Sequence, residues 1–282
     1  MLFPGSRRRL LLGASALAAT CTLGACSLLV PPVLPRMDTL HLPGPCPGRS
    51  DTLVVMLPGA YSRPPEFVEA GFPQALRERG GNADVLIVDS HLGYFSDRSV
   101  LRRLRDEVVQ PARAQGYRRV WLVGISLGGL GALGYAVRHG SEIDGVLALA
   151  PYLGPRRLTQ EIDDAGGPRA WLAAGLDASA PGTEDELDRE LWRTFAGPTA
   201  GLHGLKGLEG LPGLPGLPPV YLGHGLDDRF ADAHRRFAEL LAPQHVYTAP
   251  GGHDWPVWRA LWLDWLGQGL LADARCAAAP AA

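Results

Sequence analysis

The sequence has little cysteine, no marked excess of charge and no recognisable ligand set for a metal or a nucleotide. Its four cysteines are too few for a disulfide-rich scaffold. Its 27 Lys and Arg nearly balance 29 Asp and Glu, so no basic surface that would follow a nucleic acid is expected. No His, Cys and acidic residues have metal-ligand spacing, and no phosphate-binding glycine loop occurs. We therefore predict no metal, no cofactor and no nucleic acid partner.

What the sequence does contain fits one large globular domain. Its 282 residues are 46% hydrophobic, which is enough to form a sizeable core. Glycine and proline are frequent, at 36 and 25 residues. Much of that excess lies near the N-terminus and in one repetitive stretch.

The first 25 residues have the order of a secretory signal peptide: arginines at 7–9, an apolar run over 10–19, then small residues. The run is too short to be a convincing transmembrane helix. Its arginines resemble a twin-arginine signal. Leu-Gly-Ala-Cys at 23–26 resembles a bacterial lipobox, which implies a diacylglyceryl group on Cys26 and a lipid anchor in the cell envelope. Simple cleavage near Ala25 or a retained anchor helix are the alternatives. Residues 26–50 are then expected to form a lipidated tether.

The mature chain would keep two further cysteines, one at each end of the expected domain. Cys46 precedes it and Cys276 lies in an Ala-rich tail, residues 273–282, that we expect to be disordered. Domain termini often lie close together, and an oxidising compartment permits a disulfide between them. Two unpaired thiols are the alternative.

From residue 51 to 272 short apolar runs alternate with helical patterns. The expected strands are 52–57, 84–89, 120–125, 145–150, 220–223 and 245–248. The expected helices are 66–79, 98–115, 127–138, 231–241 and 255–270. This order predicts an α/β fold with a mostly parallel, doubly wound sheet. The sheet is expected to be abbreviated, because residues 30–50 show no strong hairpin pattern for additional leading strands.

One connection, residues 151–219, is much longer than the others and lacks a clear strand. Within it, residues 184–195 have a helical apolar pattern. A lid over the site at the carboxyl ends of the strands is one interpretation, and a surface insertion is the other. Residues 201–218 consist of six Gly-x-y triplets, too few for a collagen helix, and are interpreted as an extended connector.

A Gly-x-Ser-x-Gly pattern at 124–128 lies between an expected strand and an expected helix. It predicts a tight turn that exposes the Ser126 hydroxyl at the sheet edge, beside the free N–H groups of a helix N-terminus. A serine needs a base, and His253 follows the last expected strand. The base needs an acid, and Asp227 and Asp228 both follow the preceding strand. All three groups are therefore expected at one edge of the sheet, in the chain order Ser, Asp, His.

These motifs resemble the α/β-hydrolase superfamily over roughly residues 51–270, and in particular its small bacterial serine esterases. The resemblance implies that the acid, commonly three residues after a glycine, is Asp228, with Asp227 as the alternative. It also implies an oxyanion hole formed by Leu127 N–H and a donor from Ala60 or Tyr61. The loop at 57–61 lacks the His-Gly-Gly form of many lipases, so the donor is left open.

Three other residues are candidates for lining the substrate site: His91, Tyr94 and Trp255. Packing or solvated roles are their alternatives, and the tryptophans at 255, 258, 262 and 265 have the spacing of a buried helix face.

The sequence thus predicts an exported serine hydrolase that cleaves carboxylic esters of small molecules through an acyl-enzyme. Two rivals remain open: a thioesterase or lipase of the same fold, and an idle envelope lipoprotein that uses the fold for binding. Oligomeric state is not predicted.

Overall fold

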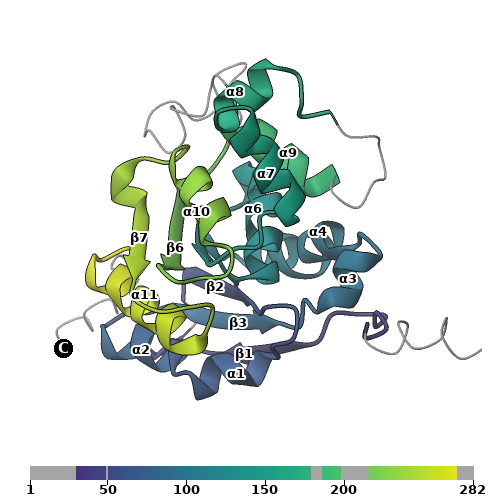
Figure 1. Cartoon of the computed structure of the whole chain (residues 1–282). Coiled ribbons are helices and arrows are strands. Elements are labelled where there is room, and N and C mark those ends of the chain that lie inside the picture. The colour runs from purple at the N-terminus through teal and green to yellow at the C-terminus, as the bar shows by residue number, and fades with distance from the viewer. Residues whose placement is uncertain (1–29, 49, 179–185, 198–215, 272–282) are drawn as a thin grey trace, which may run out of the picture. The chain divides into compact units, whose positions relative to one another are not determined.

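A computed structural model describes residues 30–48, 50–178, 186–197 and 216–271 (Figure 1). The predicted signal peptide, Cys26, Cys276, the C-terminal tail and most of the Gly-x-y stretch lie outside these ranges. None of the helices in the described ranges is both long and apolar enough to span a bilayer.

A seven-stranded sheet with the order β1-β3-β2-β4-β5-β6-β7 forms the centre of the domain. The strands are β1 (Thr39–Leu42), β2 (Thr52–Leu57), β3 (Asp84–Val88), β4 (Arg119–Ile125), β5 (Gly145–Leu149), β6 (Val220–Gly225) and β7 (Val246–Ala249). All neighbouring strands pair in parallel except β1, which pairs antiparallel with β3. The predicted α/β class with a mostly parallel sheet is confirmed.

The helices between the strands divide into those of the main layers and those of the long insertion. In the main layers they are α1 (Pro64–Glu69), α2 (Phe72–Glu78), α3 (Leu92–Ser96), α4 (Val100–Arg103), the π-helix η2 (Leu104–Val109), α5 (Gln110–Ala114), α6 (Leu127–His139), α10 (Ala231–Ala238) and α11 (Trp255–Gly267). Short 3₁₀ turns, η3 (Gly140–Glu142) and η5 (Pro243–His245), precede β5 and β7. The insertion contributes α7 (Arg156–Asp164), α8 (Pro168–Ala173) and α9 (Glu186–Ala196).

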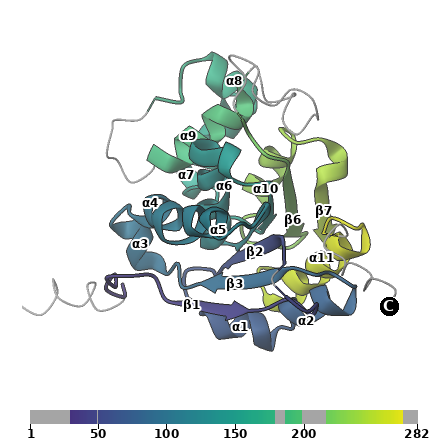
Figure 2. The same cartoon turned by 180° about the vertical axis from the view of Figure 1, so that it is seen from behind.

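Alternate residues of the central strands feed two separate cores, one on each face of the sheet. In β2, Leu53 and Val55 join one cluster and Val54 joins the other. The helices α4–α6 and α10 cover the first face, and α1, α2 and α11 cover the second (Figures 1 and 2). Strands that are apolar on both faces are what two helical layers require.

The edge strand β1 corrects one expectation. The sequence predicts that residues 39–42 belong to the tether, but they pair with residues 85–88 of β3. Their side chains alternate between exposed and half-buried, so the pattern in the sequence is weak. The sheet is therefore one strand larger than predicted.

Two expected helices are interrupted, each for a local reason. The helix predicted at 66–79 breaks at Gly71, whose φ of 72° lies in the left-handed region that favours glycine. The helix predicted at 98–115 widens into η2, where the N–H of Gln110 bonds to Arg105 O. Pro111, next in the chain, has no N–H and would crowd the carbonyl four residues earlier, which accounts for the wider turn.

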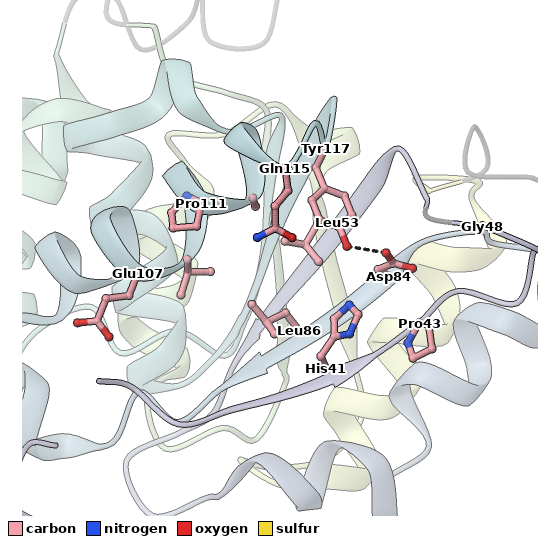
Figure 3. Close-up of a pocket in the computed structure, with 12 residues that line it drawn as sticks. His41, Pro43, Gly48, Leu53, Asp84, Leu86, Glu107, Pro111, Gln115 and Tyr117 are labelled. Carbon is pink, nitrogen blue, oxygen red and sulfur yellow. Dashed lines mark hydrogen bonds between the residues drawn. The ribbon is translucent and has the colours of Figure 1, made fainter. Parts of the chain in front are cut away.

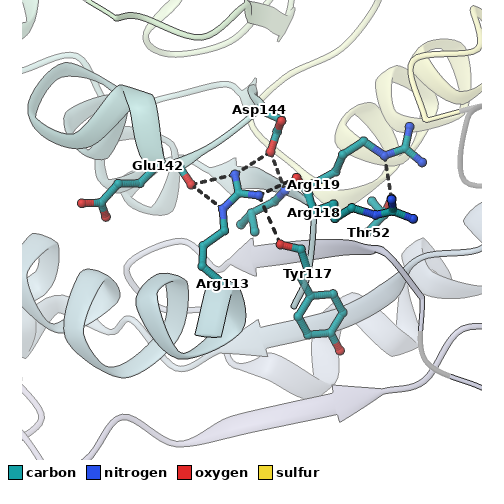
Figure 4. Close-up of polar contacts among 8 residues, drawn as sticks. Thr52, Arg113, Tyr117, Arg118, Arg119, Glu142 and Asp144 are labelled. Carbon is teal, nitrogen blue, oxygen red and sulfur yellow. Dashed lines mark hydrogen bonds and ion pairs between the residues drawn. The ribbon is translucent and has the colours of Figure 1, made fainter. Parts of the chain in front are cut away.

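Arg113 of α5 fastens the amino edge of the sheet (Figure 4). Its guanidinium donates to the carbonyl oxygen of Glu142 at 3.0 and 2.9 Å and to the carboxylate of Asp144 at 2.7 Å. The same group reaches the carbonyl oxygens of Tyr117 and Arg118. One side chain thus joins α5 to the turns that precede β4 and β5.

The described part of the insertion packs on the outer side of the first helical layer. Leu187 of α9 lies against Gly134 of α6, and Arg138 pairs with Glu190 at 2.6 Å. The indole N–H of Trp192 donates to Leu153 O at 2.9 Å, which fixes α9 to the start of the insertion. A lid role for residues 151–219 stays a prediction.

Cys46 is disulfide-bonded. Its predicted partner, Cys276, lies outside the described residues, so the pairing itself stays a prediction.

Candidate functional site

Ser126 occupies the sharp turn between β4 and α6. Its backbone has φ 53° and ψ −114°, a conformation rarely adopted by residues other than glycine. The turn closes because two glycines let backbone pass at very short range. A Cβ on Gly124 would lie 2.2 Å from Gly128 O, and one on Gly128 would lie 2.1 Å from Leu57 O. The glycines of the motif are therefore steric requirements of the turn.

His253 brings its imidazole to this serine from the loop after β7. Its Nε2 lies 2.9 Å from Ser126 Oγ, a contact between residues 127 positions apart. Its Nδ1 lies 2.7 Å from Asp228 Oδ2. Side-chain exposures of 8% for His253 and 0% for Asp228 place this second contact out of water.

The acid is held from several directions. Asp228 Oδ1 accepts the N–H of Phe230 at 2.8 Å, and Oδ2 accepts from His253. Burial alone would raise the pKa of Asp228, but these hydrogen bonds outweigh it and lower the pKa. Asp228 is therefore a carboxylate at neutral pH. Asp227, by contrast, is exposed.

The protonation pattern follows from these contacts. A carboxylate only accepts hydrogen bonds, so Nδ1 of His253 carries the proton toward Asp228. Nε2 then has a free lone pair, and Ser126 Oγ–H donates to it. The arrangement can remove a proton from the hydroxyl and hold the resulting imidazolium against a negative charge.

Two aromatic rings hold the imidazole in place, and the sequence did not single them out for this role. Phe230 meets the ring of His253 edge-on at 5.2 Å between centroids, and Trp258 does so from another direction at 5.1 Å. Helical spacing identified Trp258 only as part of a buried face. Its distance from His253 depends on how the loop 250–254 folds, which periodicity does not reveal.

The loop after β2 lies against the nucleophile. A Cβ on Gly59 would lie 3.5 Å from Ser126 Cβ, at van der Waals contact distance. The loop forms a turn in which Ser62 N–H donates to Gly59 O at 3.1 Å. Within the described residues, the N–H groups of Ala60, Tyr61 and Leu127 have no hydrogen-bond partner. Donors are thus available on both sides of Ser126.

The three residues predicted to line the substrate site have other contacts. His91 caps α3, with Nδ1 accepting Gly93 N–H at 3.1 Å. Tyr94 is fully buried, and its hydroxyl accepts Leu34 N–H at 3.2 Å, so this ring packs in the core. Trp255 is half-buried and packs edge-on against Phe67 at 5.3 Å.

A pocket of about 520 Å³ lies elsewhere, between η2–α5 and the strands β1, β2 and β3 (Figure 3). It is lined by Leu53 and Asp84, near the first residues of their strands. Ser126 and His253 follow the last residues of theirs. Because the strands are parallel, the pocket and the Ser126 site open at opposite edges of the sheet. Both carboxylate oxygens of Asp84 already accept hydrogen bonds, one from Gly44 N–H and one from the Tyr117 hydroxyl.

Metal ligation is not apparent in the described ranges. No group of three or more His, Cys, Asp or Glu side chains is placed there to hold an ion.

Solved structures share this fold at low sequence identity. An S-formylglutathione hydrolase (FrmB) from Staphylococcus aureus is 13% identical, with a TM-score of 0.51 over 84% of this chain and 98% of that one. FphF, a fluorophosphonate-binding serine hydrolase of the same organism, is 15% identical, with a TM-score of 0.52 over 83% and 98%. Est1E from Butyrivibrio proteoclasticus is 13% identical, with a TM-score of 0.54 over 84% and 93%.

A search of curated proteins finds no match to the chain. A family model described as the alpha/beta hydrolase family matches residues 54–263, which include most of β2, all of β3 to β7 and all three residues of the hydrogen-bonded chain. The protein therefore belongs to the alpha/beta hydrolase family.

Proposed function

We propose that the protein is a serine hydrolase that cleaves carboxylic esters through an acyl-enzyme. The observation that carries the proposal is the unbroken hydrogen-bonded chain from Asp228 through His253 to Ser126, with contacts of 2.7 and 2.9 Å. Such a chain, at the carboxyl edge of a parallel sheet, is the arrangement that makes a serine nucleophilic.

In the proposed reaction His253 Nε2 accepts the hydroxyl proton as Ser126 Oγ attacks the ester carbonyl. Asp228 stabilises the imidazolium that forms. The imidazolium then gives its proton to the departing alkoxide, and the acyl group stays on Oγ. Water repeats the sequence: it gives a proton to Nε2, attacks the acyl carbon and releases the acid, and Oγ recovers its proton.

The oxyanion is proposed to be held by Leu127 N–H and by a donor of the loop after β2. Ala60 and Tyr61 both have an N–H without a partner among the described residues, and Gly59 of the same loop lies beside Ser126. The N-terminus of the 13-residue helix α6 adds positive potential at the same point.

Small esters are the favoured substrates, because alkoxides leave more readily than amines. The comparison proteins support this class: one of the solved structures holds ferulic acid bound to Est1E, and FphF is substrate-bound. The preferred acyl length and leaving group are determined by assaying a panel of esters.

The test is labelling with a fluorophosphonate probe together with hydrolysis of a p-nitrophenyl ester panel of increasing acyl length. We expect wild type to be labelled and to turn over short esters, and Ser126→Ala to lose both. Ser141→Ala, at an exposed serine of η3, is the matched control and should keep both activities. A wild-type protein that neither reacts with the probe nor cleaves any ester would favour the idle binding protein. A preference for long chains or thioesters would favour a lipase or a thioesterase.

We also propose that the protein is exported and anchored in the bacterial envelope by a lipid on Cys26. The support is the order of the first 26 residues: arginines, a short apolar run and Leu-Gly-Ala-Cys.

A further inference from the structure

A second histidine lies behind the Ser126 site and takes no part in the proposed proton transfers. His234, in α10, is 0% exposed, and its ring lies 4.9 Å from that of His224. We propose that His234 is a positioning residue that ties the turn carrying Ser126 to the loop carrying Asp228. This role rests on the proposed ester hydrolysis.

A hydrogen bond joins His234 to the segment that follows β5. His234 Nε2 lies 2.9 Å from the carbonyl oxygen of Pro151, a contact between residues 83 positions apart. A carbonyl only accepts, so Nε2 carries the proton and donates. The other ring nitrogen, Nδ1, is buried and has no hydrogen-bond partner among the described residues. Among the described residues the ring therefore makes one hydrogen bond, to Pro151.

Pro151 belongs to residues 149–152, which form hydrogen bonds with both the backbone N–H and the backbone carbonyl of Ser126. Ser126 N–H donates to Leu149 O at 2.9 Å, and Ser126 O accepts Tyr152 N–H at 2.9 Å. Between them Ala150 has φ 44°, an uncommon value outside glycine. Pro151 also fills the space beside Gly129, where a Cβ would lie 2.8 Å from it. Any shift of residues 149–152 therefore moves Ser126.

His234 is also connected to Asp228, through the start of α10. The helix α10 starts at Ala231, three residues after Asp228, whose carbonyl oxygen accepts Ala231 N–H at 2.9 Å. The first turn continues with His234 N–H donating to Phe230 O at 3.1 Å. Asp228 and His234 are therefore joined by successive backbone hydrogen bonds at the start of α10. The contact with Pro151 links this segment to the one that holds Ser126.

Proton transfer is sensitive to such distances, since a displacement of about 1 Å can lower a rate about 100-fold. Loss of the contact should lower kcat by about 10- to 100-fold and leave KM within about twofold. A residue that merely filled space would lower stability and leave the kinetic constants of the folded protein unchanged.

Three substitutions separate these cases. His234→Leu removes the donor and keeps the volume. His234→Gln carries an amide N–H as many bonds from Cβ as Nε2, whereas in His234→Asn the amide is one bond too short to reach Pro151 O. We measure kcat and KM on a soluble p-nitrophenyl ester, the rate of fluorophosphonate labelling and the thermal midpoint. His234→Gln should come within about threefold of the wild-type kcat, and the other two should not.

His245→Leu is the matched control. His245 is half-buried, bonds to backbone of Val220 and packs on Tyr221 at 4.3 Å, but it lies at the amino edge of the sheet. The His245→Leu variant should have a lower thermal midpoint than wild type and an unchanged kcat. If His234→Leu does not fold, the comparison of Gln with Asn decides.

Equal kcat in the Gln and Asn variants would overturn the positioning role, and so would a wild-type kcat in His234→Leu. In either case the proposed function would still stand, provided that the wild type cleaves esters. A wild type without ester hydrolysis or labelling would overturn both.

Discussion

Two adjacent aspartates, Asp227 and Asp228, occupy opposite environments. The sequence placed both after the same strand and could not separate them without the family resemblance. The structure buries Asp228 against His253 and leaves Asp227 exposed. The turn at 225–228, in which Asp228 N–H donates to Gly225 O, determines which of the two side chains faces His253.

Replacing the acid should therefore have very unequal effects. We expect Asp228→Asn to lower kcat by about 10²–10⁴-fold, because an amide no longer holds the imidazole in its active tautomer. Asp227→Asn should change kcat less than about threefold and serves as the control. Steady-state kinetics on one ester checks both, and the reverse ranking would show that Asp227 is the acid.

The turn that carries Ser126 depends on Gly128 for space. An added Cβ would lie 2.1 Å from Leu57 O, a backbone atom that cannot move without shifting β2. We expect Gly128→Ala to lower the free energy of unfolding by about 3 kcal/mol or more and to abolish probe labelling.

Gly131, one turn further along α6, is the matched control for this change. An added Cβ there meets the tip of the Phe95 ring at 3.2 Å, and that side chain can move. Because alanine also favours a helix, Gly131→Ala should stay within about 1 kcal/mol of wild type in urea unfolding. A tolerated Gly128→Ala would mean that the turn is not as tight as described.

Elements with strong apolar patterns were predicted well. The run at 52–57 forms β2 with the expected bounds, and the helix expected at 127–138 differs by one residue. The elements that were not predicted have sequence patterns that are weak or that favour another structure. The strand β1 is four residues long with exposed alternate positions, and η2 depends on one proline in an otherwise helical pattern. In the site, the order Ser, Asp, His was predictable, whereas the contacts of Phe230 and His234 arise from packing between distant segments.

Buried histidines couple the stability of the whole domain to pH. Burial is the main cause that lowers the pKa of His139, His224, His234 and His245. For His234 burial outweighs the opposing contacts with Pro151 and Asp228, and the pKa falls from 6.5 to about 4. Between these values the unfolded chain binds a proton at this residue and the folded chain does not. Stability therefore falls as the solution is acidified.

Urea unfolding at pH 7 and pH 5 tests this dependence. Over that interval His234 should account for a loss of about 2 kcal/mol in wild type, at about 1.4 kcal/mol for each pH unit below 6.5. His234→Gln has no proton to gain there, so its loss should be smaller by that amount. Equal losses in the two proteins would mean that His234 is protonated in the folded state well above pH 4.

The antiparallel direction of β1 has a consequence for how the domain is approached. Thr39 pairs with Val88, the last residue of β3, so the leading end of the domain enters at the rim that bears Ser126. The helix α11, which starts just after His253, takes the chain back toward the other rim. A substrate that approaches the rim bearing Ser126 therefore also meets the start of β1 at that rim.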